Sequence, residues 1–100
     1  MTDTWNAEKL AGTLHQTNPP AGLPPLVEAL WWEAKGNWTR AHEIAQEIHT
    51  RDAAWVHAYL HRREGDASNA GYWYRNAGRP VCTLPLEEEW SEIATALLAS

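Results

Sequence analysis

Apolar side chains recur at intervals of three and four residues through most of this chain of 100 residues. That spacing places them on one face of an α-helix, whereas a half-buried strand alternates apolar and polar residues. No useful length of the sequence alternates in that way, so we expect an all-α protein without strands. The pattern predicts about six helices, at residues 5–15, 24–35, 38–50, 53–64, 67–77 and from 85 to about 97.

Glycine followed by an Asx residue marks two of the predicted boundaries between helices. Gly36 precedes Asn37, and Gly65 precedes Asp66. Glycine readily adopts the left-handed conformation that ends a helix, and an Asx side chain accepts a backbone N–H at the start of the next one. We therefore expect a positive φ at both glycines. Asp52 is expected to cap the fourth helix.

The sequence repeats itself with a shift of 29 residues. Leu30–His49 aligns with Tyr59–Gly78, which superimposes the two boundary glycines and places Ala41 on Ala70. A period of roughly 20–50 residues is typical of stacked helical hairpins, because one hairpin cannot bury its apolar face alone. We predict a single domain, 1–100, made of an N-terminal cap helix with a Pro-rich loop (1–22), two stacked antiparallel hairpins (23–79) and a C-terminal cap helix (80–100).

A familiar motif lies in the fifth predicted helix. It reads Asp-x-x-x-Ala-x-x-Trp-Tyr-x-x-Ala, on Asp66, Ala70, Trp73, Tyr74 and Ala77. This motif resembles the second helix of SEL-like repeats, which are relatives of the tetratricopeptide repeats. The resemblance implies hairpins that bind a protein or peptide in a groove. The surrounding segment is also similar to a group of small bacterial helical proteins of unknown function, a likeness that implies no activity.

Composition narrows the classes of partner. The formal net charge of −5 disfavours nucleic acid and anionic membrane surfaces, both of which attract basic proteins. Cys82 is the single cysteine, so no intrachain disulfide can form. The first residues show neither the basic start nor the apolar stretch of a secretory signal, and no run is long enough for a membrane helix. We expect a cytoplasmic protein.

Three residues of the fourth predicted helix form a candidate metal site. His57, His61 and Glu64 follow one another at i, i+4 and i+7, so they share one helical face. The repeat offers a different interpretation, because the shift of 29 residues maps His57 onto Glu28. We expect His57 and His61 to pack against the second helix, with Glu28 as a hydrogen-bond acceptor. Metal ligation and a plain solvated stripe are the alternatives.

Aromatic side chains and arginines provide a candidate binding surface. The chain has seven tryptophans and no phenylalanine, and we expect most of the tryptophans in the core. Adjacent aromatic residues point about 100° apart on a helix, so each aromatic cluster should expose at least one ring. Together with nearby arginines they could form a groove for a ligand or peptide. The candidates are Trp31, Trp32, Arg62, Tyr72, Arg75 and Arg79.

Polar residues begin the first and last predicted helices. Asp3 or Thr4 is a suitable cap for the first helix. Glu87, Glu88 and Glu89 lie in the first turn of the last helix, where negative charge suits the helix dipole. We expect all three glutamates to be a solvated helix start.

No motif in the sequence points to catalysis. We therefore expect a non-catalytic helical-repeat domain that binds a protein or peptide, or that associates with itself as a homo-oligomer, without a cofactor. The alternative is a small metal- or ligand-dependent enzyme that uses the face of His57, His61 and Glu64.

Overall fold

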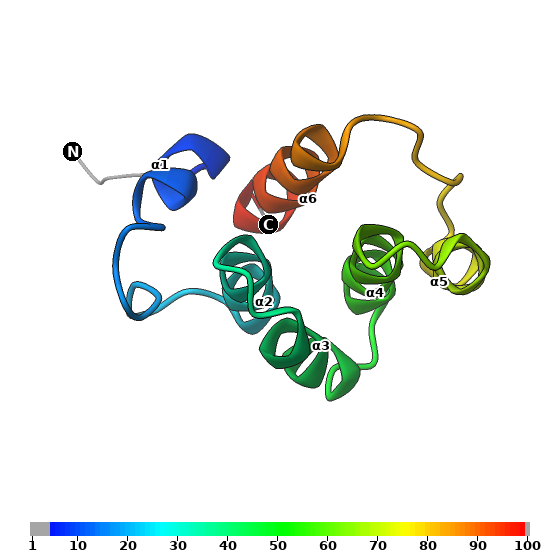
Figure 1. The fold of residues 1–100 in the computed structure, drawn as a ribbon, viewed down its shortest axis with the longest axis horizontal. Helices are drawn as coiled ribbons and strands as arrows, with labels where there is room; N and C mark the ends of the chain where they lie inside the picture. The colour runs from blue at the N-terminus through cyan, green and yellow to red at the C-terminus, as the bar shows by residue number, and fades with distance from the viewer. Residues whose placement is uncertain (1–4, 100) are drawn as a thin grey trace.

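The protein is all-α, as its sequence predicts. A computed structural model describes residues 5–99, and over that range it contains six helices and no strand. Figure 1 shows the helices following one another around a compact body that measures 41 × 26 × 25 Å. Their bounds are α1 Ala7–Gly12, α2 Pro25–Ala34, α3 Trp38–Gln46, α4 Arg51–Arg63, α5 Ala67–Ala77 and α6 Leu86–Ala99.

Two helical hairpins form the centre of the chain. α2 packs against α3, and α4 packs against α5. At the corners, Gly36 and Gly65 have φ values of +91° and +89°, which confirms the expected left-handed conformation. Asn37 and Asp66 then cap α3 and α5, each accepting the backbone N–H three residues further on. The local chemistry of the Gly-Asx pair therefore sets both corners.

α4 is the central helix of the molecule. Every residue from Ala53 to His61 is buried, because α4 contacts α2, α3, α5 and α6. In Figure 1, α4 lies between α5 on one side and α2, α3 and α6 on the other. Ala41 on α3 and Ala70 on α5 are 0% and 2% exposed, which confirms the expectation that both lie buried.

α6 covers one side of the two hairpins. It packs against α1, α2 and α4. Its buried face includes Ile93 and Leu97, and Trp90 donates from Nε1 to the carbonyl oxygen of Leu30 at 2.9 Å. The last helix thus joins α2, α4 and the short α1 around one apolar core.

Several predicted boundaries differ from the structure. The third helix ends at Gln46 rather than near residue 50, and α4 begins at Arg51. Thr50 caps α4 by accepting the N–H of Ala53, so the predicted cap at Asp52 is wrong. A cap oxygen serves the residue two or three positions further on, and the earlier start of α4 gives that position to Thr50.

The first helix is shorter than predicted. It spans only Ala7–Gly12, and Asn6 caps it by accepting the backbone N–H of Lys9. The predicted caps Asp3 and Thr4 lie outside the described residues.

The tryptophans occupy the core less completely than expected. Three are buried, three are partly buried against the core, and one is 37% exposed. The buried ones are Trp31, Trp55 and Trp90, the partly buried ones are Trp32, Trp38 and Trp73, and the exposed one is Trp5. Among residues 5–99, the helices fall short of the length and apolar character needed to cross a membrane.

Candidate functional site

A groove of about 760 Å³ runs between α3 and α5 along one side of α4. Its described lining residues belong to α3, α4, α5 and the segment between α3 and α4, and none belongs to α6. Its lining combines four histidines, two aromatic rings, three amides and one arginine. The residues are His42, Gln46, Ile48, His49, Thr50, Arg51, Ala54, His57, His61, Asn69, Tyr72, Trp73 and Asn76.

Three histidines form a connected ring cluster on the floor of this groove. His57 and His61 come from α4, and His42 comes from α3. The ring centroid of His42 lies 4.9 Å from that of His57 and 5.5 Å from that of His61. Each of the three residues offers a ligand nitrogen, and these nitrogens lie within 4.8 Å of one another. We call these three residues the histidine cluster.

Indole rings hold the histidine cluster from both sides. Trp73 of α5 stacks on His57 with a centroid distance of 4.1 Å and an interplanar angle of 12°. Trp38 of α3 stacks on His42 at 4.9 Å and 11°. Trp38 also donates from Nε1 to the carbonyl oxygen of Leu60, which fixes its own ring. The two imidazoles are therefore oriented by rings that are anchored on neighbouring helices.

Burial makes protonation of these imidazoles unfavourable. His57 is 4% exposed, and its Nδ1 is buried without a hydrogen-bond partner. Desolvation, with smaller contributions from His42 and His61, lowers the pKa of His57 to about 4. Desolvation also lowers the pKa of His42, and the charge of Glu64 opposes that shift. His57 is therefore neutral at pH 7, with a lone pair available for a ligand.

Among the three described histidines of the cluster, His61 is the one with a recorded contact to a carboxylate. Its Nδ1 lies 2.7 Å from Oε2 of Glu64, one turn further along the chain. The predicted burial of His57 and His61 is confirmed, but the predicted hydrogen bond to Glu28 is wrong. The two histidines face α3 and α5 instead of α2, because the facing rings belong to His42 and Trp73.

The wall on α5 presents an exposed aromatic ring. Tyr72 is 51% exposed and meets Trp73 edge-on, at 5.3 Å and 90°. Asn76 donates from Nδ2 to the carbonyl oxygen of Tyr72 at 2.8 Å. Arg51 stands at the start of α4 and is the one arginine or lysine of the lining. The groove residues that the structure describes include no aspartate or glutamate.

The residues predicted to form a binding surface do not share one surface. Trp31 is completely buried against Trp32, so its candidacy is wrong. Arg62 is held by Glu89, and the guanidinium of Arg79 lies 3.4 Å from the ring centroid of Trp55. Trp32 is half-buried, and Arg75 is exposed on α5. Of the six predicted residues, Tyr72 alone lines the groove.

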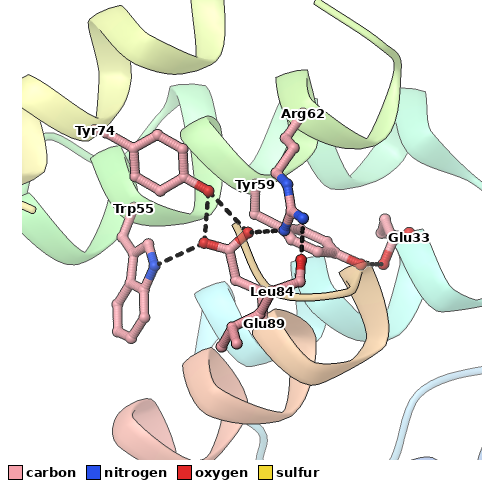
Figure 2. Close-up of polar contacts among 7 residues, drawn as sticks. All are labelled: Glu33, Trp55, Tyr59, Arg62, Tyr74, Leu84 and Glu89. Atoms are coloured by element: carbon pink, nitrogen blue, oxygen red, sulfur yellow. Dashed lines mark hydrogen bonds and ion pairs between the residues drawn. The ribbon is translucent and has the colours of Figure 1, made fainter. Parts of the chain in front are cut away.

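A second buried polar cluster lies on the α6 side of α4. Glu89 is 0% exposed, so the expectation that it is solvated is wrong, whereas Glu87 and Glu88 are exposed. Figure 2 shows its carboxylate surrounded by donors from two other helices, α4 and α5. Tyr74 donates at 2.6 and 2.8 Å, Arg62 at 2.9 Å and Trp55 at 3.4 Å. Burial of Glu89 is possible because these donors satisfy the charge.

Arg62 extends this network to the linker before α6. Besides Glu89 it donates to the carbonyl oxygen of Leu84. On the same side of the molecule, Tyr59 donates to Glu33 at 3.1 Å, and Arg63 lies 3.2 Å from the same carboxylate. Burial raises the pKa of Glu33 and also that of Tyr59. Glu33 thus joins α2 to α4, and Glu89 joins α6 to α4 and α5.

Two important residues escaped the sequence analysis. His42 sits beside the apolar stripe of its helix and looks like a boundary residue, because the ring that it meets belongs to another helix. Glu89 sits in a run of three glutamates whose members look equivalent. A weak signal exists for Glu89: it lies three residues after Leu86 and four before Ile93, a spacing that places it on the predicted apolar face of the last helix.

Comparison with known proteins adds no relative. The chain matches no protein-family model, no curated protein and no solved structure. The resemblance to SEL-like and tetratricopeptide repeats stays a prediction from the sequence.

Proposed function

We propose that this protein is a non-catalytic helical domain that binds an acidic peptide segment of a partner protein in the groove between α3 and α5. One observation carries the proposal. The groove combines an exposed aromatic ring with a cation and lacks a carboxylate among its described lining residues, in a chain whose net charge is −5.

Aromatic and amide groups supply the general part of recognition. Tyr72 offers an exposed ring, and Trp73 lies beside it at the groove's edge. Tyrosine, tryptophan and arginine are enriched in protein interfaces because they combine a large apolar area with polar atoms. The side-chain amides of Gln46 and Asn69 can donate to, and accept from, an extended peptide backbone.

Charge supplies the preference for an acidic segment. Most of the chain's 13 acidic residues lie elsewhere on the molecule and repel an acidic peptide, whereas Arg51 attracts one to the groove. His49 is exposed in the same groove, where its ring can donate a hydrogen bond to a carboxylate. An acidic segment is therefore steered to this face.

A direct binding measurement tests the proposal. The probes are fluorescent synthetic peptides of mixed acidic and aromatic sequence, each matched by a copy in which lysine replaces every acidic residue. We expect the fluorescence anisotropy of the acidic peptides to rise on addition of the protein, and that of the lysine copies to stay unchanged. Tyr72→Ala and Arg51→Glu should each weaken binding at least about tenfold.

Arg75→Glu provides the matched control for charge. Arg75 is exposed on α5 and does not line the groove, so the change should leave peptide affinity within about twofold. Equal weakening by Arg51→Glu and Arg75→Glu would overturn the proposal, because net charge alone would explain it. A dimer in sedimentation that Tyr72→Ala dissociates, without peptide binding, would assign the groove to a second copy of this chain instead.

A further inference from the structure

We infer that His42, His57 and His61 form a binding site for a divalent transition-metal ion of the zinc class on the floor of the groove. Their ligand nitrogens lie within 4.8 Å of one another, on two helices that pack together. Imidazole nitrogen is a preferred ligand of zinc. The inference concerns these three side chains and does not depend on peptide binding.

The separations suit a tetrahedral ion after a small adjustment. A Zn–N bond of about 2.0–2.1 Å places two imidazole nitrogens of a tetrahedral site about 3.3 Å apart. Ring rotations of the three histidines therefore need to shorten distances of up to 4.8 Å by about 1.5 Å. Three protein ligands leave one position, and this position faces the groove, where water can fill it.

His57 supplies independent evidence for a ligand. Its Nδ1 is buried and has no hydrogen-bond partner, an arrangement that costs free energy unless something binds there. A neutral imidazole is the form that ligates a metal. An ion held by the cluster would satisfy the side chain that the fold leaves unsatisfied.

Glu64 takes the place that a carboxylate commonly has beside a metal-binding histidine. Such a histidine gives one ring nitrogen to the ion and donates from the other to a carboxylate, which fixes its orientation. Nδ1 of His61 already contacts Oε2 of Glu64 at 2.7 Å. Nε2 of His61 is then the nitrogen left for the ion. The predicted trio of His57, His61 and Glu64 thus becomes three histidines with Glu64 behind one of them.

The arginines next to the cluster in the sequence do not oppose the ion. The sequence places Arg62 and Arg63 next to the histidines, but both side chains turn to the other side of α4. Arg62 lies 2.9 Å from Glu89, and Arg63 lies 3.2 Å from Glu33. Trp73 stacks on His57, and Trp38 stacks on His42. These contacts already restrict the two imidazole rings, so metal binding costs less side-chain entropy.

Titration of the full chain with Zn²⁺, after treatment with a chelator, tests the site. We expect one ion per chain by calorimetry and a melting temperature that rises with Zn²⁺ and returns on adding chelator. Co²⁺ should give the intense visible absorption of a tetrahedral nitrogen site. Absence of both the Co²⁺ absorption and the Zn²⁺-dependent rise at millimolar metal would overturn the inference.

Three variants locate the site. His42→Ala removes a half-buried ligand and should abolish one-to-one binding. Glu64→Gln keeps the ligands but weakens the hold on His61, so affinity should fall about 10–100-fold. His49→Ala, in the groove but outside the cluster, should bind as wild type does.

Glu64→Gln also covers the case in which His42→Ala does not fold, because Glu64 is exposed. Unchanged affinity in a folded His42→Ala, or in Glu64→Gln, would overturn the site as described. An equal loss in His49→Ala would also do so, because it would indicate adventitious surface binding.

Discussion

On the α6 side of α4, the buried carboxylate of Glu89 accepts hydrogen bonds from Tyr74, Trp55 and Arg62. On the groove side, the buried imidazole of His57 has a nitrogen with no partner at all. Both sides bury an ionisable group at α4. The first arrangement is complete within the chain, whereas the second leaves a buried polar atom unpaired.

This difference separates stability from function along one helix. A buried charge with all its donors in place joins the helices that supply them, and removing it leaves those donors unsatisfied. A buried neutral ring without a partner contributes packing but carries a free-energy cost. The donors around Glu89 therefore join the helices on the α6 side, and the groove side is the face that we propose binds a ligand.

Removing the carboxylate on the α6 side should have the largest effect. Glu89→Ala leaves Arg62 as a charge without its partner and Tyr74 as a buried hydroxyl without an acceptor. We expect the free energy of unfolding to fall by about 3–5 kcal/mol, measured by urea denaturation with circular dichroism. Glu88→Ala, one residue earlier and exposed, should change it by less than about 0.5 kcal/mol. Similar effects of the two variants would erase the distinction between the sides.

Acid should weaken the groove side through His57. Its pKa is about 4 in the folded protein and near 6.5 when unfolded. Below pH 6.5 the unfolded chain takes up a proton that the folded chain does not. The contribution of neutral His57 to the free energy of unfolding is therefore fully present above pH 6.5. It decreases as the pH falls, and by pH 4 the free energy of unfolding is lower by up to about 3 kcal/mol.

His57→Phe isolates this effect. Phenylalanine keeps a ring against Trp73 but cannot take up a proton. The stability of wild type minus that of the variant should fall between pH 6.5 and pH 4, in urea titrations with a chelator present. The other groups near the ring, His42, His61 and Glu64, remain in both proteins, so the difference reports His57. A constant difference over this range would contradict the assignment.

Overpacking the contact between α4 and α5 should have an intermediate effect on both sides at once. Ala70 is buried where α5 meets α4, and leucine has no space there. Ala70→Leu should lower the free energy of unfolding by about 1–3 kcal/mol. Ala67→Leu, at an exposed position of the same helix, is the control and should have little effect. Equal stability of the two variants in thermal melts would mean that α5 is not fixed by this contact.

Replacing the glycine at the corner before α5 should give the smallest change in the free energy of unfolding. The same replacement at a glycine inside α5 should change it in the opposite direction. Gly65 has a φ of +89° with open space around a built Cβ, so Gly65→Ala tests backbone strain alone. We expect a loss of about 1 kcal/mol. Gly71 lies inside α5 with ordinary contacts, and Gly71→Ala should stabilise by about 0.5–1 kcal/mol. Two changes of the same sign in urea denaturation would contradict this account.

Sequence reasoning succeeded where the determining chemistry is local. The positive φ of Gly36 and Gly65 follows from the Gly-Asx pair itself, and the shared face of His57 and His61 follows from their spacing. The number and order of helices follow from apolar spacing within each segment. None of these features needs knowledge of a distant part of the chain.

It failed where a contact joins separate helices. His42 enters the histidine cluster only because α3 packs on α4 at one particular rotation. Glu89 differs from Glu87 and Glu88 only because Tyr74 and Arg62 come within reach of its side chain. A sequence pattern records which residues share a face, but it does not record which face of another helix they meet.

The position of α6 has a consequence for the order in which a newly made chain acquires its fold. α6 begins 23 residues after the end of α4, at Leu86 against Arg63. At about 5–20 residues per second, a ribosome takes roughly 1–5 s to add that stretch. Through that interval Arg62 has no carboxylate to bind, and the side of α2 and α4 that α6 covers stays exposed. The growing chain thus exposes this apolar surface until α6 has been synthesised. A chaperone that binds apolar surface would be useful during this interval.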